Sequence, residues 1–183
     1  MAAGPKAWVG FKAFALAFSH YSFVVLPWIP IVVFVNDHVF ELTTIRGPSM
    51  SPYFNERYNE TTSSDVCLTR KFWPQQDLQR GMIVTFYNPL KPDVLTTKRI
   101  VGLPDDLIRT KPPFPDPYVR VPPNHVWVEG DEGGSLTKDS NTYGPISIRL
   151  IQGRVSHIVW PLRKAGTVKW WEHPDRLAAF RNA

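Results

Sequence analysis

The stretch Arg46-Gly47-Pro48-Ser49-Met50-Ser51-Pro52 follows an apolar run and places Ser49 directly after one proline, with a second proline three residues later. Pro48 fixes its own φ and favours an extended Gly47, and Pro52 acts in the same way on Ser51. We therefore expect Ser49 to sit on a stiff turn, with Gly47 leaving room for another chain to approach. A serine is a weak nucleophile until a neighbouring base takes its proton. The remaining chain has to supply that base.

The totals favour a mostly β domain. The chain has 183 residues, which is enough for one core and an anchor. Its eighteen prolines and eleven glycines favour turns and short strands over a helical bundle. Its net charge of +5 is modest, and no block of lysine or arginine resembles a nucleic-acid surface, so we expect no nucleic-acid partner. Cys67 is the only cysteine, which excludes an internal disulfide and argues against a cysteine-based metal site.

An uncharged segment precedes the serine turn. Residues 13–36 form 24 residues without Asp, Glu, Lys or Arg, and as a helix at about 1.5 Å per residue they would cross a bilayer. A buried core helix and a cleaved signal peptide are the alternatives. No small-residue cleavage pattern follows Val35, so we favour an uncleaved anchor.

The flanks of this segment differ in charge. Lys6 and Lys12 precede it, whereas Asp37 and Glu41 follow it, so the positive-inside rule places the main domain in the far compartment. We divide the chain into an N-terminal segment 1–12, a transmembrane anchor 13–36, a catalytic domain 37–161 and a basic aromatic tail 162–183. The tail could lie on a membrane or cap the domain.

Strands are predicted where β-branched, aromatic and alternating residues occur between turn signals. Residues 53–64, 111–117 and 130–144 are expected to be loops. The predicted strands are 65–69, 82–87, 93–102, 118–121, 125–129 and 154–160.

The base for Ser49 is not obvious from the residues alone. The five histidines are His20, His38, His125, His157 and His173, and none forms an ordered Ser, Asp and His series with a nucleophile elbow. A lysine can act as base when apolar surroundings lower its pKa. Lys98 lies within a predicted strand among apolar residues. The alternative interpretation is an ordinary solvent-exposed lysine on an edge strand.

Four segments together resemble the type I signal peptidase family. Ser49-Met50-Ser51-Pro52 resembles the S-M-x-P nucleophile box, and residues 98–106 resemble the K-R-V-V-G-L-P-G-D lysine box. Gly130-Asp131 with residues 139–144 resembles the last box, and residues 80–84 resemble the G-D-I-V strand, with Met82 replacing the acid. These boxes occur in family order, behind a predicted anchor, across about residues 40–160.

The resemblance implies a signal-peptidase-like β-barrel or β-sheet catalytic domain behind one N-terminal transmembrane helix. It implies a membrane-bound serine endopeptidase with a Ser/Lys dyad, in which Ser49 is the nucleophile and Lys98 the base, and which uses no cofactor and no metal.

The mitochondrial members are the most similar branch. Asp139-Ser140-Asn141 and the short distance between the last two boxes resemble them more than the bacterial enzymes, and the endoplasmic reticulum members carry histidine where this chain has Lys98. This implies a single-pass protein of the mitochondrial inner membrane whose catalytic domain faces the intermembrane space. It would remove sorting or signal peptides from precursor proteins, together with a sister peptidase subunit.

Further site residues are carried over from the family. Gly47 stands where bacterial members have an oxyanion-hole serine, so that hole would rely on backbone N–H groups. Thr137 or Ser135 would orient the lysine. The resemblance also implies that Arg99, Asp131 and Asp139 hold the shape of the site. Ile45 and Met50 would line a shallow substrate pocket.

Two other functions remain open. The chain could be a non-catalytic, membrane-anchored partner that stabilises a sister peptidase, although both Ser49 and Lys98 are present. It could also be a soluble self-cleaving repressor, which shares the Ser/Lys chemistry, but the predicted anchor and the absence of a helix-turn-helix pattern argue against this.

Overall fold

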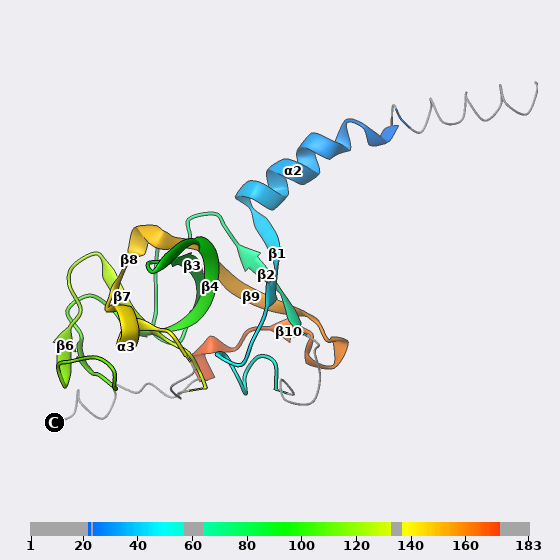
Figure 1. The fold of residues 1–183 in the computed structure, drawn as a ribbon. Coiled ribbons are helices and arrows are strands. Elements are labelled where there is room, and N and C mark those ends of the chain that lie inside the picture. Colours follow the sequence, from blue (N-terminus) through cyan, green and yellow to red (C-terminus); the bar gives the residue numbers. More distant parts are fainter. Residues whose placement is uncertain (1–21, 23, 57–63, 133–136, 173–183) are drawn as a thin grey trace, which may run out of the picture. The chain divides into compact units, whose positions relative to one another are not determined.

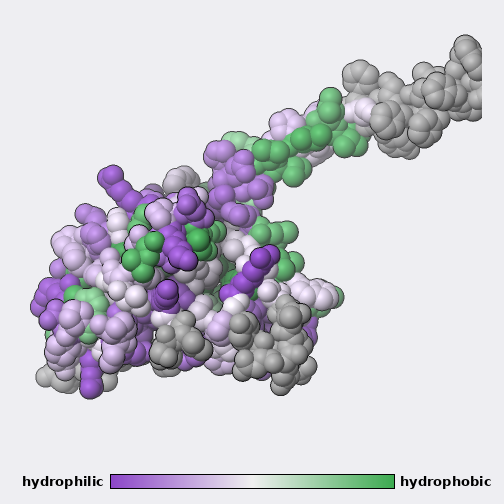
Figure 2. All heavy atoms as spheres, viewed as in Figure 1, coloured by the Kyte–Doolittle hydropathy of each residue, from purple (hydrophilic) through white to green (hydrophobic). Residues whose placement is uncertain are grey.

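The computed structural model describes residues 22, 24–56, 64–132 and 137–172, which fall into two compact units, Met1–Val39 and Phe40–Ala183 (Figure 1). In the first unit, α2 (Trp28–His38) is an 11-residue helix with no buried residue. Its apolar side chains are exposed and give the helix a mostly apolar surface (Figure 2). Because exposing apolar side chains to water costs free energy, this helix is more stable in an apolar environment than in water.

Only part of the predicted anchor is described, because residues 13–21 and 23 lie outside the described residues. Among the residues that are described, no helix combines the length and the apolar character needed to cross a bilayer. The transmembrane span 13–36 therefore stays a prediction.

The second unit is built on one large antiparallel sheet, which confirms the mostly β prediction. The strands lie in the order β1-β2-β9-β3-β4-β7-β8, and β10 pairs with β9. A separate hairpin pairs β5 with β6. The bounds are β1 (Phe40–Ile45), β2 (Asp65–Arg70), β3 (Ile83–Asn88), β4 (Lys91–Gly102), β5 (Leu107–Arg109), β6 (Tyr118–Arg120), β7 (His125–Glu129), β8 (Ile146–Ser147), β9 (Ile151–Trp160) and β10 (Gly166–Thr167).

The six predicted strands are all present, with ends shifted by up to three residues. Sequence analysis missed β1, β5, β8 and β10, and it missed the short helix α3 (Ser140–Tyr143) within the expected loop 130–144. Short 3-10 turns occur at η1 (Ile148–Leu150), η2 (Leu162–Lys164) and η3 (Trp170–Glu172).

The core has two main parts. One includes Ile45, Met50 and Phe54 together with residues of β2, β3 and β9, so it lies directly beneath the serine turn. The other joins β3, β4, β7 and β9 around Val84 and Ile100. The first part holds the end of β1 just before the serine turn, and the second holds β4 beside Lys98.

The described part of the tail packs on the domain. β10 pairs with β9, and Val168 is buried in the core part beneath the serine turn. The sequence left open whether the tail lies on a membrane or caps the domain. The described residues 161–172 pack on the domain.

Candidate active site

The serine turn begins where β1 ends at Ile45. The Ser51 N–H donates to the Pro48 carbonyl at 2.7 Å, and the Phe54 N–H donates to the Met50 carbonyl at 2.8 Å, so Ser49 lies within the first of two overlapping turns. Gly47 has a φ of +82° and is not extended as expected before a proline. No described atom lies within 4 Å of where its Cβ would be, so the glycine is needed for backbone conformation and the space beside it is open.

Asn55, which sequence analysis missed, holds both ends of this turn. Its side-chain amide donates to the carbonyls of Ile45 (2.8 Å) and Gly47 (3.0 Å). Its side-chain oxygen accepts from the Asp65 N–H at 2.8 Å, and the Asp65 carboxylate accepts from the Asn55 N–H at 3.0 Å. Asn55 itself has a φ of +52°, a conformation that asparagine tolerates better than most residues.

Lys98 lies in β4 opposite Val84 of β3 and is only 3% exposed. This burial excludes the alternative of a solvent-exposed edge lysine. Removal from water disfavours the ammonium form and lowers the pKa of Lys98 to about 8, although the charges of Asp139, Asp131 and Glu132 act in the opposite direction. A substantial neutral fraction near neutral pH is the property that a general base requires.

Arg99 neutralises one of these acids. Its guanidinium donates to both carboxylate oxygens of Asp131, at 2.7 and 2.5 Å, and to the Gly81 carbonyl at 2.8 Å. It also lies over the ring of Tyr53, 5.1 Å from the centroid. The bidentate pair is buried, and it links β4 to the serine loop and to the loop after β7.

Asp139 is held by other donors. Its carboxylate accepts from the N–H of Gly130 at 3.2 Å, from the N–H of Asn141 at 3.0 Å and from the Asn141 amide at 3.1 Å, and it caps α3. These bonds connect Asp139 to the end of β7 and to the start of α3.

The backbone of the residues that follow β7 contacts the backbone of the serine turn. A Cβ on Gly130 would collide with the Ser49 carbonyl and with the side chain of Thr137, so only glycine fits there. The Glu132 N–H donates to the Ser49 carbonyl at 3.4 Å. Thr137 is buried and donates through its hydroxyl to the Glu132 carboxylate at 3.0 Å, while Ser135 lies outside the described residues.

These contacts link several of the predicted site residues. Gly130 and Glu132 contact the backbone of Ser49, and the charges of Asp131, Glu132 and Asp139 act on Lys98. Within the part of the chain that is described, no hydrogen bond joins the Ser49 hydroxyl to Lys98 Nζ. Ile45 and Met50 are both buried in the core, so their predicted role in a substrate pocket is not visible as an open surface.

The described histidines bond elsewhere. His38 contacts the Phe34 carbonyl, His125 the Pro123 carbonyl and His157 the Ser156 hydroxyl. Among the described residues, no group of three or more side chains is arranged to hold a metal ion.

Comparison with known proteins identifies the family. The model of "Signal peptidase, peptidase S26" matches residues 18–113, a range that includes Ser49 and Lys98. The mitochondrial inner membrane protease subunit 2 of Saccharomyces cerevisiae is 38% identical over 82% of this chain and 85% of its own length. The protein of the same name from Danio rerio is 37% identical over 91% and 85%, respectively. The human mitochondrial inner membrane protease subunit 1 is 36% identical over 73% and 77%.

The similarity extends over most of the chain, and the model match contains three of the four boxes on which the resemblance rested. The chain therefore belongs to the signal peptidase family, peptidase S26.

Proposed function

We propose that the chain is a signal-peptidase-type serine endopeptidase in which Ser49 is the nucleophile and Lys98 is the general base. The observation that supports this most directly is the burial of Lys98, with its pKa lowered to about 8, beside the loop that contacts the Ser49 backbone. With this pKa about one molecule in five has a neutral Lys98 at pH 7.4, against about one in a thousand for an ordinary lysine.

In the proposed mechanism, neutral Lys98 takes the Ser49 hydroxyl proton while the oxygen attacks the scissile carbonyl. The resulting ammonium then donates a proton to the departing amine, which leaves an acyl-enzyme on Ser49. Lys98, neutral again, activates the water that hydrolyses this ester. The Ser49 N–H makes no hydrogen bond among the described residues, so it is available to the oxyanion, and Gly47 leaves the approach to it open.

The carboxylates around Lys98 must not stabilise its ammonium form too strongly. Arg99 pairs with Asp131, Gly130 and Asn141 bind Asp139, and the Thr137 hydroxyl binds Glu132. Each partner reduces the pull of one carboxylate on the ammonium form. We propose that Thr137 acts on the dyad in this indirect way, as a positioning residue.

The relatives' names suggest the setting. Proteins called mitochondrial inner membrane protease subunit 2 and subunit 1 both resemble this chain. We propose that residues 13–36 anchor it in the mitochondrial inner membrane, that the catalytic domain faces the intermembrane space, and that it works beside a sister peptidase subunit. Its substrates would be precursor proteins that carry sorting or signal peptides.

Purified full-length protein, with and without the sister subunit, provides the test of catalysis. Ser49→Ala and Lys98→Ala should each abolish precursor cleavage while circular dichroism stays unchanged. Lys98→Arg should also fail, since a guanidinium keeps its proton at neutral pH. Ser51→Ala is the matched control, because it removes a hydroxyl from the same turn. A complex that still cleaves with both alanine variants would make this chain a non-catalytic partner.

The topology has a separate test. After alkaline carbonate washing, the protein should stay with the membranes, and protease added on the intermembrane-space side should digest residues beyond about 40. Release by carbonate would disprove the anchor, and protection from protease would disprove the orientation.

A further inference from the structure

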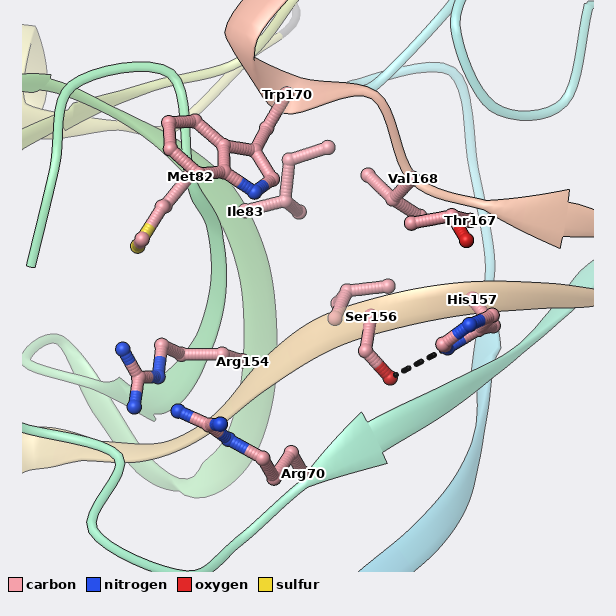
Figure 3. Close-up of a pocket in the computed structure, with 10 residues that line it drawn as sticks. Arg70, Met82, Ile83, Arg154, Ser156, His157, Thr167, Val168 and Trp170 are labelled. Atoms are coloured by element: carbon pink, nitrogen blue, oxygen red, sulfur yellow. Dashed lines mark hydrogen bonds between the residues drawn. The ribbon is translucent and has the colours of Figure 1, made fainter.

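A cavity of about 220 Å³ lies between β9, the beginning of β3 and the residues around β10 (Figure 3). Neither Ser49 nor Lys98 lines it. It is smaller than the roughly 300–1,000 Å³ of clefts that hold drug-sized ligands, so it suits a compact group or one end of a longer molecule.

Two arginines form one wall of this cavity. Arg70 ends β2 and Arg154 lies in β9, and the two are direct partners in the antiparallel register. Their side chains extend toward the same end of the cavity (Figure 3). Like charges placed directly opposite each other on neighbouring strands destabilise a sheet. A negative charge beside these two arginines would therefore stabilise this pairing.

The described protein supplies no such charge. Arg154 donates to the carbonyls of Gln76 (2.8 Å) and Trp73 (3.0 Å), which are neutral, and its Nε is buried without a hydrogen-bond partner. Arg70 has its guanidinium 4.6 Å from the ring centroid of Phe72 and makes no hydrogen bond or ion pair with a described residue. None of the ten described residues that line the cavity is acidic.

The opposite wall is apolar. It is formed by side chains from the start of β3 and from the tail, namely Met82, Ile83, Val168 and Trp170. A free inorganic anion would gain nothing from these side chains, whereas an anion attached to an apolar body would bury surface against them.

Exposed tryptophans flank the cavity. Trp73, whose carbonyl binds Arg154, is 69% exposed, and Trp171, next to the lining residue Trp170, is 56% exposed. Indole rings favour the boundary between water and lipid headgroups, where one part of the ring meets each phase. Their positions fit a ligand that itself has a polar and an apolar part.

We propose that this cavity binds a phosphate group carried on an apolar body, the chemistry of an anionic phospholipid headgroup. The phosphate oxygens accept from the guanidinium groups of Arg70 and Arg154, and the adjoining apolar portion lies against Met82 and Trp170. Guanidinium groups match phosphate oxygens in pairs, which gives the site both affinity and orientation.

Calorimetry on the full-length protein in a neutral detergent tests this site. The probes are short-chain phosphatidic acid below its micellar concentration, the matching phosphatidylcholine and inorganic phosphate. Phosphatidic acid should bind with saturation at one site, and both other probes should bind at least tenfold more weakly. Arg70→Gln should weaken phosphatidic acid binding by about tenfold or more, because it removes a charge-assisted hydrogen bond. Arg109→Gln removes an exposed arginine outside the cavity and should leave binding unchanged.

Thr167→Glu is the second variant, because Thr167 is exposed at the cavity rim and the change does not disturb the core. The added carboxylate should repel the phosphate, whereas Thr167→Gln should not. Equal binding by the Arg70→Gln and Arg109→Gln proteins, or by the two Thr167 variants, would overturn the site. Inorganic phosphate that binds as tightly as phosphatidic acid would overturn the amphiphilic ligand.

Discussion

Gly130 faces the backbone carbonyl of Ser49 so closely that no side chain fits between them. The residue after β7 thus sets the position of the nucleophile segment. A Cβ at this place would also meet the side chain of Thr137, so a side chain at position 130 would have to displace either Thr137 or the Ser49 backbone.

The first prediction follows from this contact. Gly130→Ala should lower kcat/KM for precursor cleavage at least 100-fold, because Ser49 has to move, while overpacking destabilises the fold by about 1–3 kcal/mol. Gly102→Ala is the control, since its Cβ would meet the side chain of Ile108, which no contact links to Ser49. If both variants lose activity in proportion to stability, the contact has no special role in positioning Ser49.

The second prediction concerns pH. Activity should rise with pH through one ionisation near 8 and level off above about 9, because neutral Lys98 is the active form and its pKa is lowered to about 8. Initial rates of kcat/KM between pH 6 and 10.5 measure this. A limb that still rises at pH 10 would mean that Lys98 is an ordinary lysine and that the base lies elsewhere.

The third prediction is that the catalytic lysine destabilises its own fold. Its pKa of about 8 is below the 10.5 of the unfolded chain, so the unfolded state binds more protons between these values and stability rises with pH there. Lys98→Met should therefore stabilise the protein by up to about 3 kcal/mol at pH 7, with the gain shrinking as the pH approaches 10.5. Urea unfolding of both proteins at pH 7 and pH 10 provides the comparison. A gain that is the same at both pH values would contradict the assignment.

The fourth prediction concerns Thr137, whose hydroxyl donates to Glu132. Thr137→Val keeps the shape but frees the carboxylate, whose charge then favours the ammonium form of Lys98. We expect a lower kcat with little change in KM, and a pH profile displaced toward higher pH. Thr137→Ser, which keeps the hydroxyl, should restore the profile. A change in KM alone would assign Thr137 to substrate binding.

The fifth prediction concerns Asn55. Asn55→Ala removes the side-chain bonds to Ile45, Gly47 and Asp65 and leaves buried backbone groups unpaired, so we expect a loss of about 3 kcal/mol. Thermal unfolding measures it. Since the same bonds hold the serine turn, activity per folded molecule should fall too. Full activity in the folded fraction would show that the turn keeps its geometry without them.

Local pattern was sufficient for the strands that form the centre of the sheet. Residues 93–102 are rich in β-branched residues, and they lie within β4, which carries Lys98. β1 was missed because residues 40–45 lie between the predicted anchor and the serine turn without a turn signal that would mark a strand. Only pairing with β2 across the sheet reveals Phe40–Ile45 as a strand.

The site was predicted from family resemblance more than from physics. The residues alone left Lys98 open between a buried base and an exposed edge lysine, since burial depends on the loop that covers β4. Asn55 was hidden for a similar reason. It lies in a segment whose composition is typical of a surface loop, and its partners are Ile45 and Asp65, ten residues away on either side.

The docking of the tail onto Tyr53 has a consequence for when the enzyme can act. The Lys164 ammonium donates to the Tyr53 carbonyl, and the Lys169 N–H donates to the Tyr53 hydroxyl across 116 residues of sequence. Tyr53 in turn lies beneath Arg99. The support of the serine turn is therefore complete only once residues 164–169 have docked on Tyr53. We expect the proposed peptidase activity to appear only after this docking, so that a folding intermediate without it leaves precursors uncut.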